Sequence, residues 1–554
     1  MLSVAWLQSW SRRSVQLLEC GFKGFQRVAS WDCCSRVFRA GFFPSFRLRR
    51  EVTEAETRAP FTPRLRGLPV VLGVAVLLAG CGETYRPVVT PVTTTGPAPQ
   101  PQSYAVVTTT SGTGSAGLAN VFDAPGDTLL TQASLGNGPL ALTLNSSGTS
   151  ATTANTDGTV NTFTPSTTLQ TKNIQSSTLL QPAQPVNMLS TASNLFITEP
   201  NVPAVAVLTN NSSGVYTLTQ QLPVPASPIN LAGNSNAARV YSITQDNGSN
   251  LVAFGDCETP SQVTTPGQVQ SIEISTVTIS RTLPVGICPV YGIGSTDNNR
   301  VFILNRGSGT VTVINSQLNE LDTTPNLPNL NPVTGAILLP PPAGVAPAAF
   351  NAGPVFADYY TPAAQLVTAN YDSNTITIIN TNLDTFGNDS SLFSQAVTVP
   401  VGNGPATLTI LRDGSRVYVA NQKDSTVSVV SLTSFQVLAT IPVTGHPISI
   451  ASTFSTPYGQ VYVLSSDQPY MTVIRTDTDK VAAAIQLDGT GVDVHTSAQS
   501  VAANSSTTGT VANAINVSHA SGSGAPCGFG SVYYQKSGPC SLLTNQRSPK
   551  VPAR

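Results

Sequence analysis

The chain of 554 residues is poor in charge: Asp, Glu, Lys and Arg make up only 10% of it. It has three tryptophans, all before residue 32, and three histidines. Residues 81–554 hold 15 Lys and Arg against 23 Asp and Glu, so this part of the chain is acidic. Binding to nucleic acid requires basic clusters that neutralise phosphates, and the acidic balance therefore disfavours a nucleic-acid partner.

Sequence patterns typical of enzymes and metal sites are also missing. The chain has no Gly-x-Ser-x-Gly elbow, no His-Glu-x-x-His pair, no phosphate-binding loop and no Cys-x-x-Cys-His haem attachment site. His446, His495 and His519 have no partner at metal-ligand spacing, and we interpret His446 as a turn residue. We therefore predict no catalytic residue, no metal site and no cofactor.

Aspartates are the remaining candidates for chemistry. Asp477 and Asp479 are spaced like part of a calcium-binding loop, but the glycine and the distal glutamate of such a loop are missing. We interpret this pair as a solvated turn. Four further aspartates lie in predicted turns and could line one face, where a converging pair could do acid–base work: Asp123, Asp157, Asp358 and Asp372.

The chain does contain many apolar residues, 40% of the total, and they come in short runs that alternate with Thr or Ser. This alternation predicts half-buried β-strands, whose successive side chains point to opposite faces of a sheet. Clusters of Gly, Asn, Asp and Pro separate the runs and predict turns. The sequence therefore indicates an all-β fold.

One turn–strand–turn–strand unit recurs along the chain. Its clearest copy lies in residues 413–443, where Asp-Gly-Ser precedes Val-Tyr-Val-Ala-Asn and then Thr-Val-Ser-Val-Val. The intervals between successive copies are 42 to 65 residues; the shortest match the roughly 40–45 residues of a four-stranded propeller blade, and the longer ones indicate loop insertions. A turn that ends in proline opens each copy: Pro139, Pro185, Pro228, Pro289, Pro354, Pro405 and Pro447.

These residues resemble the YVTN family of β-propeller repeats. The resemblance covers residues 104–495, is strongest over 298–490 and weakens before residue 235. It implies a ring that is commonly of seven blades, whereas pairing of the strands in 104–135 with residues 491–496 would make eight. We therefore expect a β-propeller of seven or eight four-stranded blades over residues 104–497.

A signal for export precedes the repeats. Arg64 and Arg66 are followed by an apolar run over residues 68–78, which predicts a secretory signal peptide because a bilayer span needs about 20 residues. The run ends in Leu-Ala-Gly-Cys, which resembles the bacterial lipobox and implies that Cys81 is lipid-modified and becomes the mature N-terminus. Gly82 after it favours the outer membrane. The alternative is a buried helix that ends at Cys81.

The ends of the chain differ in composition from the repeats. We interpret residues 1–51 as an extension from a misassigned upstream start codon, with a real leader as the alternative, and residues 52–80 as the signal peptide. Residues 81–103 hold the lipidated cysteine and a Pro/Thr-rich linker, which favours extended polyproline II and acts as a semi-rigid spacer. Residues 498–554 form a Ser/Gly-rich tail.

Four further cysteines lie in the exported part, and an even number in an oxidising compartment predicts disulfides. Cys257 lies in an insertion between the second and third strands of its blade, and Cys288 lies in the turn that enters the next blade. In a propeller these two loops emerge on the same face, so a bridge is feasible. Cys527 and Cys540 would close a 14-residue loop. The alternative is four unpaired thiols.

These features together predict a lipoprotein of the cell envelope, at the outer membrane or cell surface, that acts as a binding or protein-interaction scaffold for a protein or glycan partner. The insertions at residues 246–267 and 317–352 are the expected contact surface. Two alternatives stay open: a propeller enzyme of lactonase-like or quinone-dependent dehydrogenase-subunit type, by fold analogy alone, and an interaction subunit with no ligand of its own. The sequence does not indicate an oligomeric state.

Overall fold

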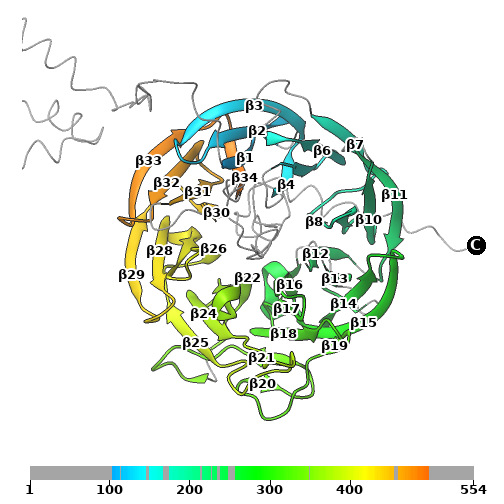
Figure 1. Ribbon diagram of the computed structural model, residues 1–554, viewed down its shortest axis with the longest axis vertical. Helices are drawn as coiled ribbons and strands as arrows, with labels where there is room; N and C mark the ends of the chain where they lie inside the picture. The colour runs from blue at the N-terminus through cyan, green and yellow to red at the C-terminus, as the bar shows by residue number, and fades with distance from the viewer. Residues whose placement is uncertain are drawn as a thin grey trace, which may run out of the picture. The chain divides into compact units, whose positions relative to one another are not determined.

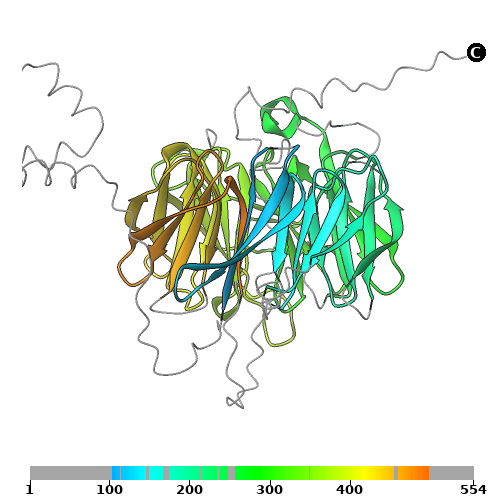
Figure 2. The same cartoon turned by 90° about the horizontal axis from the view of Figure 1, so that it is seen from above.

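The structure is a computed structural model that describes residues 103–497, apart from gaps at 113, 145–148, 166–173, 212–214, 226, 234–236, 248–251, 253–255, 348–349 and 454–458. The described residues form eight antiparallel sheets arranged in a ring around a central axis, seen down the axis in Figure 1 and from the side in Figure 2. The predicted all-β propeller is therefore confirmed, and the blade number is eight. Cys81 lies outside the described residues.

Seven blades are built from strands that follow one another in the chain, with the first strand innermost. Three of them lie in the first half of the chain: β4–β7 (Pro139–Leu144, Ala151–Asn155, Thr159–Phe163, Gln175–Thr178), β8–β11 (Asn187–Ser190, Asn194–Glu199, Ala204–Asn210, Tyr216–Pro223) and β12–β15 (Pro228–Ala232, Arg239–Thr244, Pro266–Glu273, Thr278–Ile287).

The other four lie in the second half of the chain. They are β16–β21 (Pro289–Gly294, Arg300–Asn305, Thr310–Asn315, Glu320–Leu321, Leu330–Asn331, Ala336–Leu338), β22–β25 (Pro354–Tyr360, Gln365–Asn370, Thr375–Asn380, Ala396–Pro400), β26–β29 (Pro405–Ile410, Arg416–Asn421, Thr426–Ser431, Val437–Pro442) and β30–β33 (Pro447–Ser452, Gln460–Ser465, Tyr470–Arg475, Lys480–Gln486). Short 3-10 turns lie at Asp256–Glu258, Pro260–Gln262, Thr361–Ala363 and Gln422–Asp424.

The eighth blade joins the two ends of the repeat region. Its inner strand is β34 (Thr490–Thr496), which pairs antiparallel with β1 (Tyr104–Thr110) in a register that sets Val107 opposite Val494. The outer strands are β2 (Ala116–Asp123) and β3 (Thr128–Asn137). This pairing closes the ring and removes a free sheet edge at either end of the repeat array.

The asparagine that ends the second strand of a blade explains the Asn…Thr-x-Ser/Thr pattern of the repeat. Asn421 Nδ2 donates hydrogen bonds to Thr426 Oγ1 at 3.0 Å and to Ser428 Oγ at 2.8 Å on the next strand. Asn370 makes the same two bonds to Thr375 and Thr377. The asparagine side chain thus stabilises the turn between the second and third strands, because it pairs polar groups that would otherwise lack a hydrogen-bond partner.

The turn that enters each blade is fastened to the turn between that blade's second and third strands. The backbone N–H of Asn403 donates to Asp424 Oδ2 at 2.6 Å, and the backbone N–H of His446 donates to Asp467 Oδ1 at 2.8 Å. His446 Nδ1 also lies 2.8 Å from Asp467 Oδ2. His446 is therefore the turn residue that its position predicted.

Neighbouring blades are joined through a tyrosine of the second strand. Tyr418 donates its hydroxyl to Asp479, which also accepts a hydrogen bond from Arg416 Nη1 at 2.5 Å. Asp479 has a left-handed backbone (φ 51°), a conformation that Asp and Asn tolerate better than most residues. The predicted turn at Asp477 and Asp479 is confirmed. The Asp479 side chain, expected to be solvated, is instead half-buried and joins two blades.

Apolar side chains on both faces of each sheet fill the space between blades. The largest buried cluster runs through the blades from β12 to β28 and includes Phe302, Ile303, Tyr359 and Phe393. Burial of such side chains is the main source of stability in a ring whose single sheets have two apolar faces. Among the residues described, no helix is long and apolar enough to cross a membrane.

Candidate functional site

The blade β16–β21 carries the longest insertion. In place of a single outer strand, the chain between β18 and β22 forms three short strands, β19, β20 and β21, that widen the sheet at the outer edge of the ring. Figure 1 shows β20 beyond the circle that the outer strands of the other blades follow. The insertion predicted at residues 317–352 is therefore placed on the rim, far from the axis.

A second loop, residues 381–395 between β24 and β25, packs against this insertion. Asn329 Nδ2 donates to the Ser394 carbonyl oxygen at 3.0 Å, and Ser394 donates its hydroxyl to the Pro328 carbonyl. Thr398 Oγ1 on β25 donates to the Pro340 carbonyl at 2.6 Å. Two neighbouring blades thus contribute to one stretch of rim.

A buried ion triad anchors both loops to the ring. Arg300 on β17 lies 2.6 Å from Asp322 Oδ2 of the insertion and 2.7 Å from Asp389 Oδ1 of the second loop. All three side chains are buried. Burial raises the pKa of Asp389, Arg300 lowers it, and the charge of Asp322 raises it again. Loss of the arginine would leave two carboxylates facing each other out of water, which is strongly destabilising.

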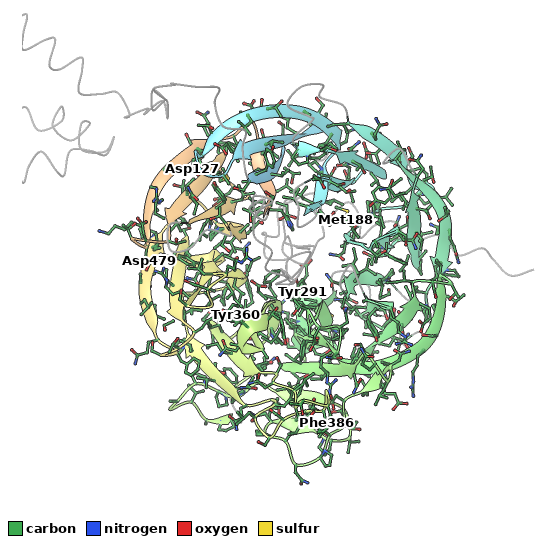
Figure 3. The ribbon with its side chains drawn as sticks, viewed as in Figure 1. Asp127, Met188, Tyr291, Tyr360, Phe386 and Asp479 are labelled. Atoms are coloured by element: carbon green, nitrogen blue, oxygen red, sulfur yellow. A yellow bond between two sulfur atoms is a disulfide. The ribbon has the colours of Figure 1, made fainter. Side chains whose placement is uncertain are left out.

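Large apolar side chains on the insertion, on the second loop and on β25 are exposed to solvent. Phe386 is 87% exposed, Val333 80% and Leu338 61%. Leu392 and Val397 are also exposed. We call these five residues the rim surface; Figure 3 shows Phe386 at the outer part of the ring. Exposed apolar residues are common when scattered singly, but a group rimmed by polar residues marks an interaction site.

Charge is nearly absent from the rim surface. No lysine or arginine lies between Arg306 and Arg412. Six acidic residues occupy this interval, and four of them are paired with arginines of the ring: Asp322 and Asp389 with Arg300, Asp372 with Arg306, and Glu320 with Arg281. Depletion of charge with an exposed aromatic is typical of the centre of a protein–protein interface.

The other predicted insertion, residues 246–267, lies next to the predicted disulfide. Cys257 and Cys288 form a disulfide with their Cα atoms 5.5 Å apart. Arg306 Nη1 donates to the Cys257 carbonyl at 3.0 Å, and the same guanidinium is 2.7 Å from Asp372 Oδ1. The described part of this insertion is therefore a cross-linked structural element. Cys527, Cys540 and His519 lie outside the described residues.

The four aspartates predicted in turns do not converge on one face. Asp157 and Asp372 lie in turns between second and third strands, and Asp123 ends β2. Asp358 was expected in a turn, but it lies on β22, an inner strand. Its neighbours Ala357 and Tyr359 are buried. The prediction for Asp358 is therefore wrong.

Several polar residues lie on the innermost strands, around the axis of the ring. The sequence patterns did not predict this arrangement. Asp358 on β22, Tyr291 on β16, and Asp493 and His495 on β34 are all on innermost strands. His495 Nε2 lies 3.5 Å from Asp493 Oδ2. Burial raises the pKa of Asp358 to about 6, although backbone N–H groups of Ile410 and Tyr359 lower it. Across the residues that the structure describes, no three His, Cys, Asp or Glu side chains are grouped to hold a metal ion.

Comparison with known proteins identifies no family and no activity for this chain. No protein-family model and no curated protein matches the chain. Among solved structures, apo AztD from Citrobacter koseri is 11% identical and covers 71% of this chain and 97% of its own, with a TM-score of 0.49. A putative 6-phosphogluconolactonase from Bacteroides fragilis is 12% identical, with coverages of 72% and 99% and a TM-score of 0.44. Similarity at this level carries no argument about what this chain binds or does.

Proposed function

We propose that this protein is a lipid-anchored scaffold of the cell envelope that binds a protein partner through the rim surface. The observation that carries the proposal is the group of exposed apolar side chains around Phe386, built on two loops that Arg300 fixes to the ring. A rigid ring presents such a surface without an ordering cost on binding.

A protein is the partner class that this surface fits best. The rim surface projects from the ring, whereas small ligands are bound in concave pockets. Glycan recognition needs several polar groups that converge on sugar hydroxyls, but the side chains exposed here are Phe, Val and Leu. Aromatic and aliphatic anchors of this kind supply most of the energy in protein–protein binding.

The envelope location rests on the sequence. The Leu-Ala-Gly-Cys string at Cys81 resembles a lipobox, and the linker that follows it holds five prolines in residues 84–102. A stiff spacer of this kind lifts a domain away from a lipid surface. The repeats resemble the YVTN family, and that resemblance supports a propeller that presents its loops to a partner.

Site-specific photo-crosslinking in the producing cell tests this function. A photoreactive phenylalanine analogue is placed at Phe386 or at Val333, and in two control proteins at Leu129 or Leu180, which are exposed apolar positions outside the rim surface. We expect the same protein to be cross-linked from both rim positions and from neither control. Cross-linking of one protein from all four positions, or from none, would contradict the proposal.

A further inference from the structure

The inner strands of the ring carry almost no charge, and the charge they carry is negative. The eight innermost strands are β4, β8, β12, β16, β22, β26, β30 and β34. None of them contains a lysine, an arginine or a glutamate. Their ionisable acids are Asp358 and Asp493, with His495 as the one basic group. Two carboxylates inside a low-dielectric wall create a negative potential along the axis.

Asp358 is held in place by neutral groups. One oxygen accepts the Ile410 N–H at 3.0 Å and the other accepts the Tyr359 N–H at 2.8 Å. Within the described residues no lysine or arginine pairs with it, and part of its side chain is exposed although it lies on an inner strand. A carboxylate in this position keeps lone pairs for a further donor, because each oxygen accepts more than one hydrogen bond.

Asp493 lies on the far side of the ring from Tyr291. The inner strands β34 and β16 are separated by three inner strands in either direction, so they face each other across the axis. Asp493 is fully buried and accepts hydrogen bonds from Ser449 Oγ at 2.8 Å and from the Leu142 N–H at 3.3 Å. Its position is therefore fixed by two neighbouring blades.

Tyr291 lies on an innermost strand and is 2% exposed. Its hydroxyl has no hydrogen-bond partner among the residues that the structure describes. Asp358 lies on the neighbouring inner strand β22, two residues after the Phe356 ring that Tyr291 contacts, and Asp493 lies on the inner strand across the ring. Burial raises the pKa of Tyr291, and the charges of both aspartates raise it further. Figure 3 shows Tyr291 at the inner margin of the sheets. Buried polar atoms without a partner are rare in native proteins and indicate a missing ligand or water.

An aromatic pair stands beside this hydroxyl. The ring of Tyr291 packs on Phe356 of the next inner strand, with centroids 4.8 Å apart. Aromatic faces attract cations, and the attraction grows where water is excluded. The axis therefore combines carboxylate oxygens, a free hydroxyl oxygen and aromatic faces, and it has no lysine or arginine on the inner strands to compensate the acids.

We propose that the axis binds a small organic cation with a primary ammonium group, held between the Asp358 carboxylate and the Tyr291 hydroxyl. An ammonium has three N–H donors and no acceptor, so it matches oxygen atoms that still have free lone pairs. Asp493 supports the cation from the opposite side through its charge. This site is separate from the rim surface and does not depend on it.

Isothermal titration calorimetry of the full chain with 1,4-diaminobutane tests the site. We expect 1,4-diaminobutane to bind and the uncharged 1,4-butanediol not to bind. Asp358→Asn keeps the side-chain shape and removes the charge, and we expect it to weaken binding at least about tenfold, because a hydrogen bond to a charged group is worth about 1.5–3 kcal/mol. Asp384→Asn, on the exposed rim loop, is the matched control and should not change the affinity.

Tyr291→Phe separates binding from folding. Removing a buried hydroxyl that has no partner should leave the unfolding temperature unchanged or higher, because a desolvated polar atom is lost. The same substitution should weaken 1,4-diaminobutane binding about fivefold, since one acceptor is missing. Absence of diamine binding, equal binding of the diol, or unchanged affinity in Asp358→Asn would overturn the proposal. Binding of calcium that displaces the diamine would also overturn it, in favour of a metal site.

Discussion

Tyr462 donates its hydroxyl hydrogen to Asp127 Oδ1 at 2.8 Å across a sequence separation of 335 residues. Tyr462 lies on β31, in the last blade formed by consecutive strands, and Asp127 lies in the turn between β2 and β3 of the blade that closes the ring. The same hydroxyl lies 2.9 Å from the Ala124 carbonyl oxygen. One side chain thus ties the end of the repeat array to its beginning, next to the β1–β34 pairing.

Replacing this tyrosine tests the closure. In Tyr462→Phe the Asp127 carboxylate stays partly buried but loses its tyrosine donor, which should lower the free energy of unfolding by about 1–2 kcal/mol. Urea unfolding of the two proteins at pH 7 measures the difference. Tyr470→Phe, on β32 of the same blade, is the control and should stay within about 0.5 kcal/mol of the wild type. An equal loss in both variants would show that Tyr462 contributes through packing alone.

The contribution of Asp127 to stability should fall as pH rises through the acidic range. Burial raises the pKa of Asp127 to about 6, well above the value of roughly 3.9 in an unfolded chain. The folded protein therefore binds the proton more tightly, so the contribution is present below pH 4 and is lost by about pH 6, to the extent of roughly 2–3 kcal/mol. Unfolding free energies at pH 4.5, 5.5 and 6.5 should show a shallower slope for Asp127→Asn. Parallel curves would contradict the prediction.

The asparagine at the end of the second strand should matter in every blade that has it. Asn421→Ala leaves the Thr426 and Ser428 hydroxyls without their shared donor, and we expect a loss of about 1–3 kcal/mol in unfolding free energy. Gln436→Ala, an exposed amide in the same blade, should change it by less than about 0.5 kcal/mol. Thermal unfolding followed by circular dichroism distinguishes them. A neutral Asn421→Ala would mean that the backbone alone sets the turn.

The Cys257–Cys288 bridge closes a segment with a sequence separation of 31 residues. In the chain-entropy model such a bridge stabilises by about 3–4 kcal/mol, so the double substitution Cys257→Ser/Cys288→Ser should lower the denaturation midpoint. Chemical denaturation under oxidising conditions provides the comparison. An unchanged midpoint would show that the neighbouring contacts of Arg306 hold this loop without the bridge.

Strand-level features could be predicted because they repeat. The second and third strands that begin at Arg416 and Thr426 occur where the alternation placed them. The weak copies around Asn155 and Phe196 are also full blades, since burial tolerates Thr and Ala where the stronger repeats use Val and Tyr. The choice between seven and eight blades depended on a pairing across the whole repeat array, and only the structure shows that pairing.

Contacts between blades could not be predicted. Arg300 meets two carboxylates from separate loops, one of them 89 residues away, and no local pattern encodes that distance. The axial group is hidden for the same reason, because Tyr291, Asp358 and Asp493 each sit singly on a different inner strand. The sequence contains no lysine or arginine between Arg306 and Arg412, and this is the signal that could have indicated the rim surface.

The most direct measurement of the central claim is the affinity of the cross-linked partner, purified, for wild type and for Phe386→Ser/Val333→Ser. Calorimetry should show at least a tenfold weaker affinity for this double variant, because central apolar anchors are worth about 2 kcal/mol or more. The control Leu129→Ser/Leu180→Ser, with two exposed apolar side chains replaced outside the rim surface, should bind like the wild type. Equal affinity of all three proteins, or an equal loss in both variants, would contradict the account.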